Sequence, residues 1–88
     1  MAVTSVNDTN ASTTLLSASV EAMGASFFND STEVLYLLQG LGTASSTAYS
    51  VKLNPGDFFT TPDERWARGG VTGIWAANAS GSVKITTW

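Results

Sequence analysis

The sequence contains no cysteine and no histidine among its 88 residues. Without them the chain has no disulfide cross-link and lacks the usual ligands of a zinc or soft-metal site. The same absence removes the cysteine nucleophile and the histidine general base, which leaves Ser and Thr hydroxyls, two lysines and seven carboxylates for any catalysis. We therefore expect a protein that is not an enzyme and that binds no cofactor and no metal.

Charged residues are scarce, at 12% of the chain, and the formal net charge is −3. Binding to nucleic acid through a basic field needs a cluster or stripe of lysine and arginine. The chain has four basic residues, and they are spread along it: Lys52, Arg65, Arg68 and Lys84. We expect no direct nucleic-acid partner.

Long apolar runs are absent as well, because no stretch approaches the ~20 residues of a membrane span. The N-terminal segment has neither the basic nor the apolar region of a signal peptide, so we expect synthesis in a cytoplasm and no membrane partner. In that setting the Asn-x-Ser/Thr triplets are chance products of an Asn-, Ser- and Thr-rich chain; they begin at Asn7, Asn10, Asn29 and Asn78.

What is abundant is Ser and Thr, with Val, Phe, Tyr and Trp, a composition typical of pleated, half-buried strands. Short alternating segments separated by turns predict seven to eight strands, at 12–17, 25–29, 33–39, 48–53, 58–60, 69–77 and 82–88, with an eighth candidate in the N-terminal segment. For the first of these strands, at 12–17, and the residues that follow it, a helix over 15–23 is the less favoured alternative. The predicted fold is all-β: a single small antiparallel β-sandwich, jelly-roll-like, over 12–88, with a polar arm or edge strand over 1–11.

Turn signals give the expected connections. Asn29-Asp30-Ser31-Thr32 predicts a hairpin between the strands at 25–29 and 33–39, and 78–82 predicts a second hairpin at the end of the chain. Asn54-Pro55-Gly56-Asp57 predicts a turn with Gly56 at positive φ. Glycine inside the strand at 69–77, at Gly73, indicates a bulge or a close backbone approach, with a neighbouring aromatic ring as a candidate to cover it.

Alternation assigns side chains to faces. Leu35 and Leu37 face one way, and Val34, Tyr36 and Leu38 the other, so this strand is expected either to be central or to meet a partner with its outer face. In the strand at 48–53, Tyr49, Val51 and Leu53 are expected to face inward. In the strand at 82–88, Val83 and Ile85 face inward and Lys84 and Thr86 outward. In the strand at 69–77, Trp75 is expected in the core.

Candidate contact residues fall in three places: the N-terminal arm, the segment 63–68 and Trp88. The mixed-charge segment 63–68 is expected to be an exposed loop, with Trp66 either tucked beneath it or presented to a partner. An acidic calcium site formed by Asp57, Asp63 and Glu64 is disfavoured by the nearby proline and arginine. The expected partner-contact residues are Val3, Val6, Asp63, Glu64, Arg65, Trp66, Arg68 and Trp88.

From Gly24 to the C-terminus the sequence resembles a family of small virion proteins of tailed bacteriophages. The resemblance is carried by core and turn segments: Leu35-Tyr36, 49–53, Pro55-Gly56, Phe58-Phe59 and 71–77, the last reading V-T-G-I-W-A-A. It implies a β-sandwich virion component, either a capsid decoration (cement) protein or a related head or tail accessory. The segment 62–68 is more charged than the family pattern, and we expect partner specificity to differ there.

The resemblance leads to a functional hypothesis: a non-enzymatic cement protein on the capsid exterior, acting as a homotrimer that bridges subunits of the major capsid protein. One alternative is a tail, fibre or connector accessory. The other is a carbohydrate-binding sandwich that uses Trp66, Trp75 and Trp88 as stacking platforms, which requires that they face the same way.

Overall fold

The computed structural model describes residues 2–7, 11–18, 23–40, 42–62, 66, 68–76 and 81–88. Eight strands lie in this part of the chain: β1 (Ala2–Asn7), β2 (Thr13–Leu16), β3 (Ala25–Ser31), β4 (Leu35–Gln39), β5 (Val51–Leu53), β6 (Phe58–Thr60), β7 (Val71–Trp75) and β8 (Gly81–Thr87). No helix in the described residues is long and apolar enough to cross a membrane.

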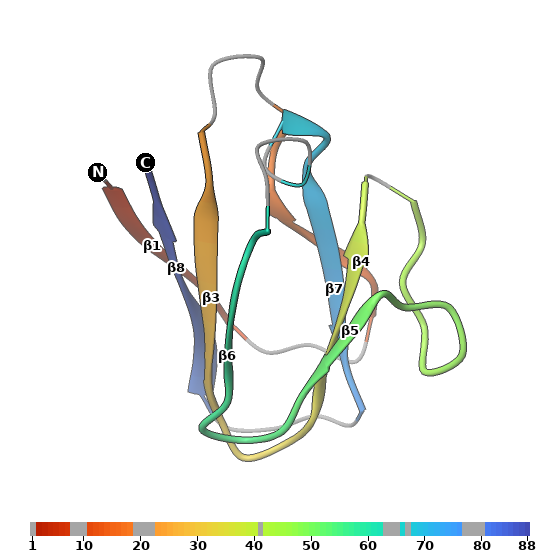
Figure 1. The fold of residues 1–88 in the computed structure, drawn as a ribbon. Coiled ribbons are helices and arrows are strands. Elements are labelled where there is room, and N and C mark those ends of the chain that lie inside the picture. The colour runs from red at the N-terminus through yellow and green to blue at the C-terminus, as the bar shows by residue number, and fades with distance from the viewer. Residues whose placement is uncertain are drawn as a thin grey trace.

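The strands form two four-stranded antiparallel sheets, in the orders β1-β8-β3-β6 and β2-β7-β4-β5. The sheets lie in two layers with the core between them (Figure 1). The all-β sandwich predicted from the composition and the turn spacing is confirmed.

The pairing follows one rule: β1 pairs with β8, β2 with β7, β3 with β6 and β4 with β5. This is the pattern of one long antiparallel hairpin that has been rolled up, and the roll adds the contacts β3–β8 and β4–β7. Eight strands in two sheets with this connectivity make a jelly roll.

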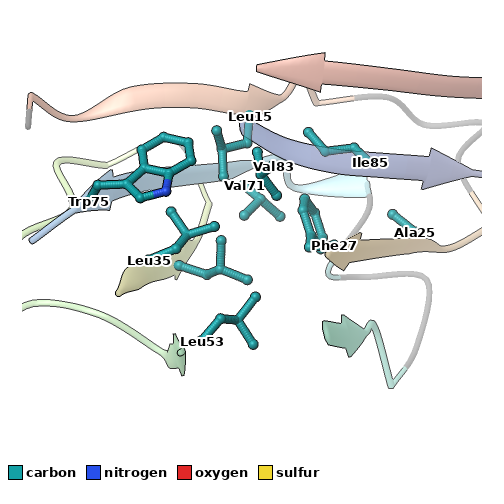
Figure 2. Packing of buried hydrophobic residues seen from close by; sticks show 10 residues of the cluster. Leu15, Ala25, Phe27, Leu35, Leu53, Val71, Trp75, Val83 and Ile85 are labelled. Atoms are coloured by element: carbon teal, nitrogen blue, oxygen red, sulfur yellow. The ribbon is translucent and has the colours of Figure 1, made fainter. Parts of the chain in front are cut away.

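Inward side chains of both sheets fill the core (Figure 2). One sheet contributes Leu15, Leu35, Leu37, Leu53, Val71 and Trp75, and the other Ala25, Phe27, Val83 and Ile85. Trp75 is 1% exposed, so its predicted place in the core is confirmed. The predicted faces of β4 and β8 are confirmed as well, because Leu35 and Leu37 are buried and Lys84 is exposed.

Gly73 lies in the middle of β7, where Leu15 of the neighbouring strand closes over it. A Cβ atom at Gly73 would lie 2.5 Å from Leu15 Cδ1 and 3.3 Å from Leu35 Cδ1. The side chains that lie closest to Gly73 are therefore aliphatic, and the aromatic ring expected there is corrected to Leu15. The register irregularity next to it belongs to β2, between Thr14 and Leu16.

Both predicted hairpins are wrong. β3 and β4 lie in different sheets, and so do β7 and β8. Each of these connections crosses from one layer to the other, as jelly-roll topology requires. A turn signal in the sequence marks where a strand ends but does not fix which sheet receives the next strand.

Asn29 shows why the chain crosses after β3. Its buried side-chain amide donates to Glu33 O at 2.9 Å and to Leu53 O at 3.0 Å, and its Oδ1 accepts from the Ser31 hydroxyl. Trp75 Nε1 donates to that same hydroxyl at 3.0 Å. This polar network ties the end of β3 to β5 and β7 of the opposite sheet.

The turn at 54–57 agrees with its prediction. Gly56 has φ of +86°, and Asp57 N donates to Asn54 O at 2.9 Å. Two other expectations are corrected. Tyr49 is 42% exposed and its ring lies 4.8 Å from that of Tyr36, on the outer side of the sheet. Leu15 belongs to a strand, so the alternative helix over 15–23 is wrong at its start.

Candidate interaction surface

The outer face of the β1-β8-β3-β6 sheet carries a row of residues fixed by strand register. Ser5 lies opposite Lys84, Lys84 opposite Phe28, and Phe28 opposite Phe58. Residues directly opposite each other in antiparallel strands point to the same face, with Cβ atoms about 5 Å apart. The row therefore crosses all four strands and places Phe28 and Phe58 side by side, with Lys84 next to Phe28 on the side away from Phe58.

These side chains are open to solvent. Phe28 is 41% exposed and Phe58 is 71% exposed. The neighbouring row contains Val3, at 68%, opposite Thr86, which in turn lies opposite Ser26. Exposed large apolar side chains that share one sheet face mark an interaction surface more clearly than scattered ones do.

Trp88 extends the same face at the end of β8. Its backbone exchanges hydrogen bonds with Gly24, at 3.1 and 3.2 Å, which continues the β3–β8 pairing by one residue. The indole lies over Gly24, where a Cβ atom would come within 2.8 Å of Trp88 Cε2 and Nε1. Gly24 thus makes room for the ring, which is held in place while the residue remains 46% exposed.

Charge on this surface is balanced. Among the outward-facing residues of the four strands, Asp30 and Lys84 are the charged ones, and Ser and Thr supply most of the remaining polar groups. The sheet face therefore has a net charge of zero in a chain whose net charge is −3. We call this surface, Val3, Phe28, Phe58, Lys84 and Trp88 with the polar residues between them, the outer face.

The outer side of the other sheet is different. Its apolar side chains, Tyr36, Leu38 and Ile74, are half-buried. The Tyr49 ring packs against Tyr36 at a tilt of 50°, and Gly42 lies close enough to Leu38 for a Cβ atom there to come within 3.3 Å of Leu38 Cδ2. The segment after β4 therefore covers part of this side and leaves less apolar surface open.

The structure divides the contact residues expected from the sequence. Val3 and Trp88 lie on the outer face, whereas Val6 points inward and packs against the core. Trp66 is half-buried against the core, with its ring 5.1 Å from that of Phe59 in an edge-on arrangement. Arg68 is exposed beyond β6. Asp63, Glu64 and Arg65 lie outside the described residues.

Phe28 and Phe58 were not among the expected contact residues, although the sequence carries a signal for them. Each belongs to a Phe-Phe pair, Phe27-Phe28 or Phe58-Phe59. Successive residues of a strand point to opposite faces, so one phenylalanine of each pair must face away from the core. Strand register, which the sequence does not provide, brings the two outward rings together.

Within the described ranges, no group of three or more Asp or Glu side chains is placed to hold a metal ion. Every buried side-chain nitrogen and oxygen found there has a hydrogen-bond partner. The outer face offers apolar burial, aromatic packing and one cation, Lys84, next to the Phe28 ring.

Comparisons of the chain with protein-family models, with curated proteins and with solved structures find no match.

Proposed function

We propose that this protein is a non-enzymatic structural component of a tailed-phage particle, a capsid decoration protein that works as a homo-oligomer on the major capsid protein. The observation that carries the proposal is the outer face, an exposed apolar surface built on the paired strands of a rigid sandwich. The resemblance of 24–88 to small virion proteins supplies the setting, and jelly rolls are a common architecture of viral capsid domains.

A decoration protein needs no chemistry to act. It stabilises a shell by adding contact area between subunits, and each contact that forms only in the assembled shell shifts the equilibrium toward that shell. Exposed Phe, Trp and Val side chains gain most from such contacts, at about 25 cal/mol per Å² of apolar area removed from water.

The positions of the tryptophans argue against a carbohydrate platform. Trp75 is buried, Trp66 packs against the core with Phe59, and Trp88 faces outward on the β1-β8-β3-β6 sheet. The three rings therefore do not form the shared strip that sugar stacking requires.

The test is a comparison of particles assembled with and without this protein, challenged by mild heat and by chelator, with released DNA as the readout. We expect particles without the protein to release DNA at lower temperature, and adding back purified protein to restore resistance. Equal resistance with and without the protein would contradict the decoration role. Immunogold labelling of intact particles distinguishes a position on the head from one on the tail.

A further inference from the structure

We propose that the outer face is a self-association surface whose occupant is a second copy of this chain, with Phe28 and Lys84 at its centre and Phe58 toward its edge. The inference rests on the proposed function only in that both require copies of this chain to associate. It adds which surface the copies use and the two-fold symmetry that relates them. Two observations support it, the order of residues in the central row and the balance of charge, and the area of the face sets the expected strength.

The central row is complementary to itself. Its order is Ser5, Lys84, Phe28, Phe58 across β1, β8, β3 and β6. A two-fold axis that runs along the strands between β8 and β3 reverses this order in the second copy. Lys84 of each copy then lies over Phe28 of the other, and Phe58 over Ser5. An isologous pair of this kind makes every contact twice, and an ammonium group over an aromatic ring is a favourable contact.

The charge favours a second copy over a strongly charged partner. Two chains that each carry a net charge of −3 repel each other at most surfaces. The outer face avoids this repulsion because Asp30 and Lys84 cancel. A basic partner would find no acidic field here, and an acidic one would meet a single lysine beside a carboxylate.

The area sets the expected strength. Four strands about 4.8 Å apart, with up to seven residues at about 3.3 Å each, give the face a footprint of roughly 400 Å². A standard stable interface buries about 800 Å² per partner, so this face alone supports a weak pair. The expected species is a dimer in exchange with monomer, which becomes more populated as concentration rises.

Sedimentation equilibrium of the purified chain over the micromolar-to-millimolar range tests the inference. We expect a monomer–dimer equilibrium, and we expect Phe58→Ser to weaken the dimer by at least about tenfold, since the most exposed aromatic ring of the face is lost from both copies. Phe58 is 71% exposed, so the variant should fold, and circular dichroism with urea unfolding checks that it does.

The matched control is Tyr49→Ser, which removes an aromatic ring, 42% exposed, from the opposite side of the sandwich. It should leave the dimerisation constant unchanged within about twofold, as expected for a residue outside the interface. Lys84→Gln should weaken the dimer, while Lys52→Gln, an exposed lysine on β5, should not.

Three results would overturn the inference: a monomer at every concentration, a trimer, or a dimer that Phe58→Ser and Tyr49→Ser affect equally. A trimer would match the stoichiometry that the resemblance implies, but it would require the face to meet a different surface of the next copy. If the chain stays monomeric and still protects particles, the decoration role stands and the outer face belongs to the capsid. If the dimer forms and particle resistance does not depend on the protein, self-association through the outer face stands and the decoration role fails.

Discussion

At the scale of single residues, Asn29 connects the two sheets through hydrogen bonds of its side chain. It is fully buried, and it joins β3 to the segment before β4 and to the end of β5 through side-chain hydrogen bonds. Its backbone also accepts from Gly56 N and donates to Asp57 O, both at 2.9 Å. A hydrophobic residue of similar size could fill the space but could satisfy none of the carbonyl groups around it.

Replacing Asn29 by Leu should therefore destabilise the protein strongly. The change removes the amide that donates to Glu33 O and Leu53 O and the oxygen that accepts from the Ser31 hydroxyl. Ser31 Oγ lies 3.1 Å from Glu33 O and can donate to it instead, so Leu53 O is the carbonyl that loses its side-chain donor. A buried polar group left unpaired costs about 1–3 kcal/mol. We expect the free energy of unfolding in urea to fall by about 2 kcal/mol.

Asn54→Leu is the control, since Asn54 is exposed in the turn at 54–57, and it should change stability by less than about 0.5 kcal/mol. If Asn29→Leu and Asn54→Leu unfold at the same urea concentration, the network does not hold the sheets together.

At the scale of elements, β1 illustrates how one strand serves two purposes. It is the edge strand of its sheet and pairs with β8 over Ala2–Asn7. Val3 and Val6 lie on opposite faces of it, Val3 outward and 68% exposed, Val6 inward against the core. The strand therefore contributes to stability on one side and to the outer face on the other.

We expect the two valines to separate these roles. Val6→Ala should lower the free energy of unfolding by about 1 kcal/mol, because it removes methyl groups packed against the core. Val3→Ala should stay within about 0.5 kcal/mol of the parent. Chemical denaturation of both variants measures the difference, and equal losses would show that β1 does not pack as described.

The sequence predicted where the strands lie far better than how they pair. Alternation and turn residues are local, so β4, β6, β7 and β8 could be recognised from a few residues each. The hairpins were wrong because Asn29-Asp30-Ser31-Thr32 suits a tight turn within a sheet as well as a crossing between sheets. Leu53 O, a partner from a distant strand, favours the crossing, and no local pattern shows it.

The candidate site divides in the same way. Val3 and Trp88 could be named because isolated apolar residues in polar or terminal segments stand out. Phe28 and Phe58 could be recognised as outward only after their strands were paired, since β3 and β6 are neighbours through register and not through sequence. Trp66 stood out for its charged surroundings, yet the structure places its ring against Phe59.

At the scale of the whole molecule, small size and surface character combine. A chain of 88 residues without disulfides buries about 60–65% of its unfolded surface and is expected to be only modestly stable alone. Association of folded copies stabilises them by mass action, because the unfolded chain does not present the outer face.

Thermal unfolding should accordingly depend on concentration. We expect the midpoint to rise by a few degrees as protein concentration increases through the range in which the dimer forms, whereas the midpoint of Phe58→Ser should stay constant. Calorimetry at several concentrations measures both. A parent midpoint that does not move would contradict stabilisation by self-association.

The rolled-up pairing also fixes an order of events during synthesis. β8 is an inner strand of its sheet, between β1 and β3, and residues 81–87 are made after the other seven described strands. Until they leave the ribosome, β1 has no partner in its sheet and β3 lacks one of its two. Contacts between such distant segments make folding slow, on the order of milliseconds to seconds. Until synthesis reaches β8, the nascent chain carries Phe27, Phe28 and Phe58 with only the β3–β6 pairing of their sheet, which makes this the interval in which a chaperone would be of most use.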